Sequence, residues 1–375
     1  MNRLIISFIL LGVGLISCKE KEEGSPERTQ SKAVSYAEGF DLGQEEDISL
    51  IYLFQGNSDT LTYALYKDEE DKAKASLLGI PLKYPIKEFV VLSSPYTAML
   101  ESLNARNSIQ AIANKDFIYS PELIEKVVKG EVAEVGSESI LDEESTAKLG
   151  ADLLLYSASP GMKQRKFAQL EALGLNCFPL SEWLELNLLG RAEWIKVIGL
   201  LLDKAAEADS LFLEVEKEYM IQLKALQALE QKPTVISSMP FKGVWYVPGG
   251  NSYMARIIKD AGGSYAWRDR EETGSVPLAF EAVYPLGVQA DIWLSPGSVK
   301  TYGELIARDE RFVDFLPYQN KKIYHNYKRS NENGGNDYWE SAVVRPHIIL
   351  KDLIHIFHPH ILPDHQSVYF APLKE

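Results

Sequence analysis

Cysteine is almost absent from the chain, whose 375 residues contain only two, Cys18 and Cys177. The residues around Cys18 predict that its thiol is modified, as described below, which leaves Cys177 without a partner in the same chain. No intrachain disulfide can then form. The fold must therefore be stabilised by the burial of apolar side chains.

Basic residues are also fewer than acidic residues. The chain has 39 lysine and arginine residues against 53 aspartate and glutamate residues, a net charge of -14. A protein with this balance is repelled by phosphate backbones and by anionic membrane surfaces. We therefore expect no nucleic-acid partner and no electrostatic attachment to a lipid surface.

The familiar catalytic motifs are missing as well. The sequence contains no Gly-x-Ser-x-Gly elbow, no dinucleotide fingerprint and no His-Glu-x-x-His helix. Gly249 and Gly250 precede a predicted helix that could bind an anion, but the lysine of a phosphate-binding loop is absent. The sequence thus predicts no catalytic residue and no cofactor, and we expect a binding protein rather than an enzyme.

Three histidines lie close together near the end of the chain, at His355, His358 and His360. Their nitrogens could bind zinc or copper. However, Pro359 ends the helix between them, and no carboxylate pattern completes a ligand set. We expect a histidine-rich helix end and no metal site, with binding of a free metal ion as the minor alternative.

The first residues have the pattern of an export signal. Arg3 supplies positive charge, and Leu4 to Leu15 form an apolar stretch that is short for a bilayer span. Leu15 to Cys18 resemble a bacterial lipobox, which implies acylation of Cys18 and removal of residues 1–17 as a signal peptide. An ordinary secretory peptide with an incidental cysteine is the alternative. Residues 18–35 are polar and charged, which predicts a flexible tether.

The lipid would then be the only contact of this protein with a membrane. We expect an exported protein anchored in the cell envelope, on the periplasmic side. The acidic run KEKEE after Cys18 resembles the surface-export signals of Bacteroidetes lipoproteins. A surface lipoprotein that captures a ligand or acts with an outer-membrane receptor is therefore the competing hypothesis.

The order of apolar segments predicts an α/β protein of two lobes. Residues 36–202 begin with a β-hairpin from Ile48 to Tyr66. Short apolar strands then alternate with helical patterns, which indicates a mainly parallel sheet. These strands are expected at residues 89–92, 109–112, 152–157 and 175–180.

A long helix is predicted to join this lobe to the next. Residues 187–202 are helical in pattern, and residues 203–230 have apolar side chains at helical spacing, with Asp203 as the expected cap. Residues 231–375 then return to the alternating pattern. Their strands are expected at 234–238, 291–295 and 322–326, before a closing helix from about Glu340 to Phe357.

This order of elements resembles the periplasmic binding proteins of ABC importers for iron-siderophores, haem and cobalamin. The resemblance spans about residues 85–360 and rests on VVLSSPYTAMLESLNA (90–105), LDEESTAKLGADLLLYS (141–157), LGRAEWIKVIGLLL (189–202), WYVPGGNSYMARIIKDAGG (245–263) and FEAVYPLGVQADIWLSPG (280–297). It implies two lobes with mainly parallel central sheets, joined by one bridging α-helix. It also implies a monomer that delivers a chelate carrying iron or cobalt to an ABC permease and its cytoplasmic ATPase.

In that family one glutamate on each lobe pairs with arginines of the permease. By position in the motifs, the resemblance assigns these roles to Glu144 and Glu281, with Asp142 or Glu143 as substitutes in the first lobe. Carboxylates at helix starts can receive bidentate arginine contacts. The alternative is that they are ordinary helix N-terminal acids, favoured by the helix dipole.

Ligands of open α/β sheets bind beyond the carboxyl ends of the strands, so the loops there are the candidate ligand contacts. Aromatic and basic residues are concentrated in these loops, which suits a large planar ligand with anionic groups. The loop Ser330 to Ser341, with Gly334 and Gly335, is expected to line the cleft or cap the last helix. The predicted ligand contacts are Tyr96, Tyr119, Arg165, Phe241, Trp245, Tyr246, Tyr327, Arg329 and Trp339.

Overall fold

The computed structural model describes residues 34–54, 60–158 and 165–375. The predicted signal peptide, Cys18 and nearly all of the predicted tether lie outside the described residues. Within the described ranges, none of the helices combines the length and the apolar character that a membrane crossing needs. We refer to residues 34–202 as the N-terminal half and to residues 233–375 as the C-terminal half.

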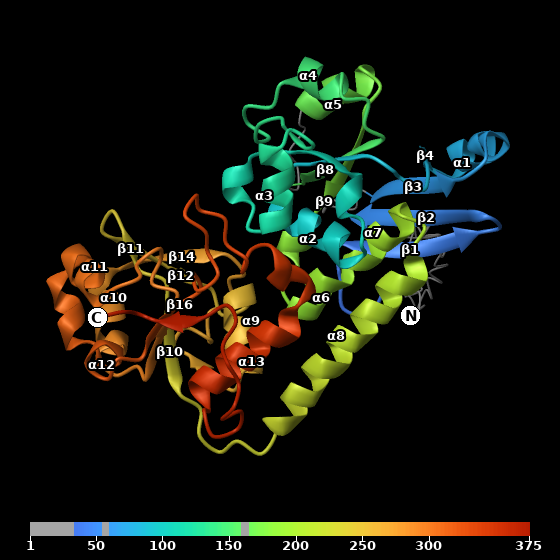
Figure 1. Ribbon diagram of the computed structural model, residues 1–375. Coiled ribbons are helices and arrows are strands. Elements are labelled where there is room, and N and C mark those ends of the chain that lie inside the picture. Colours follow the sequence, from blue (N-terminus) through green and yellow to red (C-terminus); the bar gives the residue numbers. More distant parts are fainter. Residues whose placement is uncertain (1–33, 55–59, 159–164) are drawn as a thin grey trace, which may run out of the picture. The chain divides into compact units, whose positions relative to one another are not determined.

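A five-stranded parallel sheet forms the centre of the N-terminal half (Figure 1). Its strand order is β7-β6-β5-β8-β9, and β5 is composed of three fully buried apolar residues, which explains its central position. All four predicted strands of this lobe are confirmed. The strands are β5 (Phe89–Val91), β6 (Ile109–Ile112), β7 (Ala133–Glu134), β8 (Leu153–Ser157) and β9 (Asn176–Leu180). The helices between them are α2 (Ser94–Ser102), α3 (Pro121–Val128), α4 (Glu143–Ala147) and α5 (Arg165–Ala172).

The predicted hairpin is confirmed as β2 (Ile48–Phe54) paired antiparallel with β3 (Thr60–Tyr66). It belongs to a larger sheet, because β1 (Phe40–Glu45) and β4 (Ile80–Lys83) flank it in the order β1-β2-β3-β4. The helix α1 (Lys72–Leu78) connects β3 to β4, which run parallel. One face of this sheet joins the core of the N-terminal half through side chains that include Ile51, Leu53 and Leu65.

Three helices lead from one half to the other: α6 (Leu188–Glu193), α7 (Ile195–Leu201) and α8 (Ala205–Ala225). The long helix is shorter than predicted at both ends. Asp203 does not cap it, because its backbone lies in the left-handed region (φ 59°) and its carboxylate pairs with Lys67 Nζ at 2.7 Å. At 21 residues, α8 extends for about 30 Å.

The helix α8 contributes to the hydrophobic cores of both halves. Ala208 and Phe212 are buried in the core of the N-terminal half, where α8 contacts α7. Tyr219, nearly two turns later, is buried in the core of the C-terminal half, where α8 contacts α13. Val215 packs against both cores. The helix α8 is therefore anchored in both halves.

A second mainly parallel sheet forms the centre of the C-terminal half, in the order β13-β10-β15-β16-β17, with β17 antiparallel at its edge. A small antiparallel sheet, β11-β12-β14, accompanies it. The predicted strands are confirmed here too. The strands are β10 (Thr234–Ser237), β11 (Pro240–Phe241), β12 (Val244–Pro248), β13 (Ser264–Tyr265), β14 (Ser275–Ala279), β15 (Ile292–Leu294), β16 (Ile323–His325) and β17 (Ala371–Pro372). The helices are α9 (Tyr253–Asp260), α10 (Phe280–Gly287), α11 (Tyr302–Arg308), α12 (Leu316–Gln319) and α13 (Pro346–Phe357).

A buried carboxylate ties down the start of the described chain. Glu193 is fully buried and accepts the backbone N–H groups of Ser35, Tyr36 and Ala37 at 2.7–2.9 Å. Lys196 Nζ pairs with the same carboxylate at 3.0 Å. These hydrogen bonds and the ion pair offset the cost of burying the charge of Glu193. The chain is therefore held to α6 from Ser35 onward.

We expect Glu193→Ala to lower the free energy of unfolding by about 3 kcal/mol, because it removes the acceptor of three backbone N–H groups and a buried ion pair with Lys196. Urea denaturation measures the change. Glu125→Ala is the control, because Glu125 is exposed and its ion pair with Lys129 lies on the surface of α3. Equal and small effects of the two substitutions would contradict the role of Glu193.

Candidate functional site

The strand order of the two central sheets determines where a ligand can bind. In the N-terminal half the chain runs from β5 to β6 and β7 on one side of the sheet and then returns to β8 and β9 on the other side. In the C-terminal half it likewise runs from β10 to β13 on one side and then to β15 and β16 on the other. Such reversals leave a crevice beyond the carboxyl ends of the strands, where open α/β sheets bind ligands. The residues that follow these ends are therefore the candidates for a binding site.

A pocket of about 390 Å³ opens at this edge and is lined by both halves. We call it the central pocket. From the N-terminal half it receives Ser93, Ser94 and Pro95 after β5, Glu182 and Trp183 after β9, and Leu188 and Arg191 of α6. From the C-terminal half it receives Tyr253 at the start of α9, Tyr338 and Trp339 of the loop after β16, and residues of the segment 342–349.

Aromatic rings form the rim of the central pocket. Trp183 is 42% exposed and Trp339 is 50% exposed, although both are large apolar side chains. The ring of Tyr338 meets the ring of Trp339 edge-on at 4.7 Å. The guanidinium of Arg191 lies over the ring of Tyr253 at 3.9 Å and donates to the carbonyl oxygen of Trp183 at 2.6 Å. This arrangement offers flat surfaces for stacking and one cation in the same pocket.

Arg191 Nε has no hydrogen-bond partner among the described residues, whereas the carboxyl of Glu182 interacts with the hydroxyl of Tyr96, and the hydroxyl of Tyr338 interacts with that of Tyr253. Glu182 and Tyr338 are each only 3% exposed. Burial raises the pKa of Glu182 to about 7, in spite of the nearby charge of Arg191. Buried polar groups are nearly always hydrogen-bonded, so Arg191 Nε is available to bind a ligand.

The loop after β16 joins the two halves beside this pocket. Glu340 belongs to the C-terminal half, and its carboxylate accepts the backbone N–H of Tyr119 at 2.7 Å and of Ser120 at 2.9 Å. The side-chain amide of Asn331 donates to the carbonyl oxygen of Ile118 at 2.8 Å. We call these contacts the interhalf clamp. Burial raises the pKa of Glu340 to about 7.

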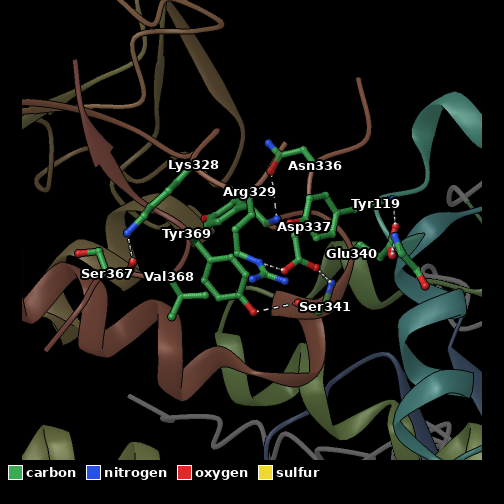
Figure 2. A network of polar contacts seen from close by, with 12 residues as sticks. Tyr119, Lys328, Arg329, Asn336, Asp337, Glu340, Ser341, Ser367, Val368 and Tyr369 are labelled. Carbon is green, nitrogen blue, oxygen red and sulfur yellow. Dashed lines mark hydrogen bonds and ion pairs between the residues drawn. The ribbon is translucent and has the colours of Figure 1, made fainter. Parts of the chain in front are cut away.

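The clamp is supported from within the loop (Figure 2). Arg329 pairs with the buried carboxylate of Asp337, and its guanidinium lies over the ring of Tyr119 at 5.0 Å. Asn336 caps the turn by accepting the N–H of Tyr338. A Cβ atom at Gly335 would lie 2.1 Å from the carbonyl oxygen of Ile118, so glycine is required for the close approach. The loop thus lines the pocket and caps the turn before α13.

The structure separates the predicted ligand contacts into groups. Trp339 lines the central pocket. Tyr96 and Trp245 do not, and the structure corrects their assignment, because both side chains are fully buried. Tyr96 OH bonds to Ser157 and to the carbonyl oxygen of Leu180. Trp245 stacks within the aromatic core of the C-terminal half and donates to a backbone carbonyl oxygen.

The other predicted contacts lie away from the lining of this pocket. Tyr119 and Arg329 take part in the clamp. Phe241 and Tyr246 are exposed on the small sheet β11-β12-β14, and Tyr327 lies beside Lys300. Arg165 is the first residue of α5, and its side chain is outside the described part of the chain.

Five pocket residues were absent from the predicted set: Glu182, Trp183, Arg191, Tyr253 and Tyr338. Glu182 and Trp183 come directly after β9, so the carboxyl-end rule could have found them. No sequence signal indicates Arg191 or Tyr253, since both lie on helices that reach the pocket only through the tertiary fold.

Both predicted docking glutamates are exposed in the first turn of a helix. The Glu144 side chain is 82% exposed on α4, 3.9 Å from Lys148. Its neighbour Asp142 is the helix cap and accepts the N–H and O–H of Ser145, so capping does not require Glu144. The Glu281 side chain is 79% exposed on α10, 3.8 Å from Arg311. Both carboxylates can therefore be reached from solution.

The terminal histidines have structural partners. His355 Nδ1 bonds to the carbonyl oxygen of Leu362 at 2.8 Å, and His358 Nε2 bonds to that of Gly262 at 3.1 Å. They line a groove of about 1160 Å³ at the amino ends of β10, β15 and β16. This groove is larger than the central pocket, but it lies at the opposite end of the strands from a typical ligand site. Among the described residues no cluster of metal-binding side chains occurs.

Comparison with known proteins agrees with this architecture. Residues 90–328 match the model of a family described as periplasmic binding protein. An uncharacterized lipoprotein of Methanocaldococcus jannaschii is 24% identical over 299 residues, which cover 77% of this chain and 69% of that protein.

Two solved structures show the same fold. A periplasmic heme-binding protein from Pseudomonas aeruginosa has a TM-score of 0.58 and 15% identity over 77% of this chain and 99% of that chain. A periplasmic heme-binding protein from Roseiflexus sp. RS-1, in apo form, has a TM-score of 0.56 and 18% identity over 74% of this chain and 99% of that chain. The predicted fold class is confirmed.

Because the interhalf clamp joins the two halves, we expect the protein to be compact even without ligand. We expect the double variant Glu340→Ala, Asn331→Ala to have a larger radius of gyration in small-angle scattering than the wild type, because it removes the acceptor and the donor that join the halves. Glu332→Ala is the control, since Glu332 is exposed on the same loop. Identical scattering of all three proteins would contradict the clamp.

The raised pKa of Glu182 predicts that the free energy of unfolding depends on pH. Its pKa is about 7 in the fold against 4.5 in the unfolded chain, so the fold holds a proton that the unfolded chain loses. The free energy of unfolding should therefore fall by up to about 3 kcal/mol as the pH rises from 4.5 to 7. Urea denaturation at pH 5 and pH 7.5 should show a smaller fall for Glu182→Gln. An equal fall in both proteins would contradict the assignment.

Proposed function

The chain belongs to the periplasmic binding protein family, and we propose that it captures a metal chelate in the central pocket and delivers it to an ABC importer. The chelate would carry iron or cobalt, as in siderophores, haem or corrinoids. The ligands of similar proteins support this choice, since two of the solved structures are described as heme-binding. Delivery would be to the transmembrane subunits of the importer, which work with a cytoplasmic ATPase.

The observation that carries the proposal is the composition of the central pocket. Two exposed tryptophans and a cation, Arg191, line the same pocket beyond the carboxyl ends of both central sheets. Flat apolar surfaces suit the conjugated or alkyl body of a chelate, and the guanidinium suits an anionic oxygen on it. The pocket volume of about 390 Å³ is large enough for part of such a ligand.

The export signal and the residues around Cys18 support a protein held in the cell envelope by a lipid on that cysteine. A relative in Methanocaldococcus jannaschii carries the description lipoprotein. The tether would keep the receptor near its permease on the periplasmic side. The acidic run after Cys18 favours the cell surface as the alternative location. Protease treatment of intact cells distinguishes the two, because only a surface protein is degraded.

We expect Trp339→Ala to weaken chelate binding by about tenfold, because it removes one stacking surface of the pocket. Quenching of tryptophan fluorescence by haem, cobalamin and ferric siderophores provides the dissociation constants. Tyr246→Ala is the control, since Tyr246 is equally exposed but outside the pocket. A loss of affinity in the control alone would move the site to the small sheet.

We expect the double variant Glu144→Ala, Glu281→Ala to lower ligand import in cells by roughly tenfold or more, because hydrogen bonds to charged groups stabilise a complex by about 1.5–3 kcal/mol each. Ligand affinity should not change. Glu125→Ala is the control, since Glu125 is also an exposed glutamate of the N-terminal half. Normal import by the double variant would refute the docking role, and weaker ligand binding would place these residues in the site.

A further inference from the structure

A second pocket, of about 320 Å³, lies among helices and shares no lining residue with the central pocket. We call it the helix pocket. One wall is a face of α8, where Leu211, Val215 and Glu218 recur at helical spacing. The rest comes from the end of α2, from α6 and α7, and from residues 344–347, which join η6 (Ser341–Val344) to α13. Its volume is in the range of sites for small ligands.

Most of the lining of the helix pocket is apolar. Phe212 of α8 and Ile195 of α7 are almost fully buried and belong to the core of the N-terminal half. Ala192 and Val344 are also buried in this core, and Leu211 packs against it. A ligand with an apolar body would therefore lose its contact with water here, which favours binding.

Two nitrogen-bearing side chains give this apolar pocket a polar side. Arg345 is exposed at its edge and forms no ion pair among the described residues. His347 Nδ1 is buried, and within the described ranges it has no hydrogen-bond partner. Burial, with the nearby charges of Lys351 and Arg345, lowers the pKa of His347 to about 4, so the ring is neutral and can donate one hydrogen bond. Both residues lie at the amino end of α13, where the helix dipole favours negative charge.

The two glutamates of the lining do not cancel this polarity. Glu218 pairs with Lys351 Nζ at 2.8 Å, so its charge is already compensated. Glu214 is exposed on α8, where water and salt screen its charge. The guanidinium of Arg345 and the unpartnered nitrogen of His347 are thus the groups left to bind a polar head.

We propose that the helix pocket binds a small amphipathic carboxylate, such as a medium-chain fatty acid, with its chain against Phe212 and its carboxylate on Arg345 and His347. A guanidinium can donate two parallel hydrogen bonds to a carboxylate. The carboxylate would also accept the hydrogen bond that His347 Nδ1 can donate. The site is independent of the function proposed for the central pocket, because no residue lines both.

Isothermal titration calorimetry of the purified full-length protein tests the site with octanoate, octylamine and 1-octanol, which share a chain length and differ in the head group. The wild type should bind octanoate at least tenfold more tightly than either other probe. Arg345→Gln should lose at least tenfold in affinity for octanoate and little for 1-octanol, because it removes a charge-assisted contact. Arg308→Gln is the control, since Arg308 is exposed on α11 and outside the pocket.

Two further variants locate the carboxylate. Ser102→Phe should abolish octanoate binding by placing a ring in the helix pocket, at little cost to the fold because the Ser102 hydroxyl donates within α2 to the carbonyl oxygen of Ala98. Arg191→Gln should leave octanoate binding unchanged, since Arg191 lines the central pocket.

No binding of octanoate, equal affinity for the three probes or tighter binding of octylamine would overturn the proposal. Loss of octanoate binding in Arg191→Gln, together with normal binding in Arg345→Gln, would also overturn it by placing the carboxylate in the central pocket. Arg345→Gln changes an exposed side chain, so it decides the question even if Ser102→Phe does not fold.

Discussion

The carboxylate of Glu340 determines how the two halves of this protein meet. It belongs to the C-terminal half, yet it accepts two backbone N–H groups of the N-terminal half, at Tyr119 and Ser120. The same loop positions Tyr338 and Trp339 at the central pocket. Because α8 is also buried in both cores, the halves are joined at two places and the pocket between them is largely preformed. Ligand binding should therefore need only a modest closure.

The buried carboxylates of this chain differ in how well they are satisfied. Glu193 accepts three backbone N–H groups and a lysine, and Glu185 accepts the N–H groups of Glu38 and Gly39 and the indole N–H of Trp194. These groups hold the start of the described chain in place. Glu182, only a few residues away in sequence, is also buried but lines the central pocket, where its carboxyl interacts with the hydroxyl of Tyr96. Burial with few hydrogen bonds raises the pKa of Glu182 to about 7.

Much of the fold could be predicted from the sequence, because the central strands are short apolar runs such as Phe89–Val91 that are buried on both faces. The site could be predicted less well. Trp245 has the composition of a ligand contact, but its ring is needed to fill an aromatic core, and sequence alone does not distinguish the two uses. Arg191 was missed because it lies on a helix that reaches the pocket only after the halves have come together. Asp203 has the right residue type for a cap but the wrong backbone conformation.

We propose that a metal chelate binds in the central pocket, in contact with Trp183 and Trp339 and beside Arg191. Anomalous X-ray scattering at the iron edge, from crystals grown with a ferric chelate, locates the metal directly. We expect one strong peak in the central pocket, with ligand atoms close to Arg191 Nε. A peak in the groove beside His355 and His358, or on the small sheet beside Phe241, would contradict it.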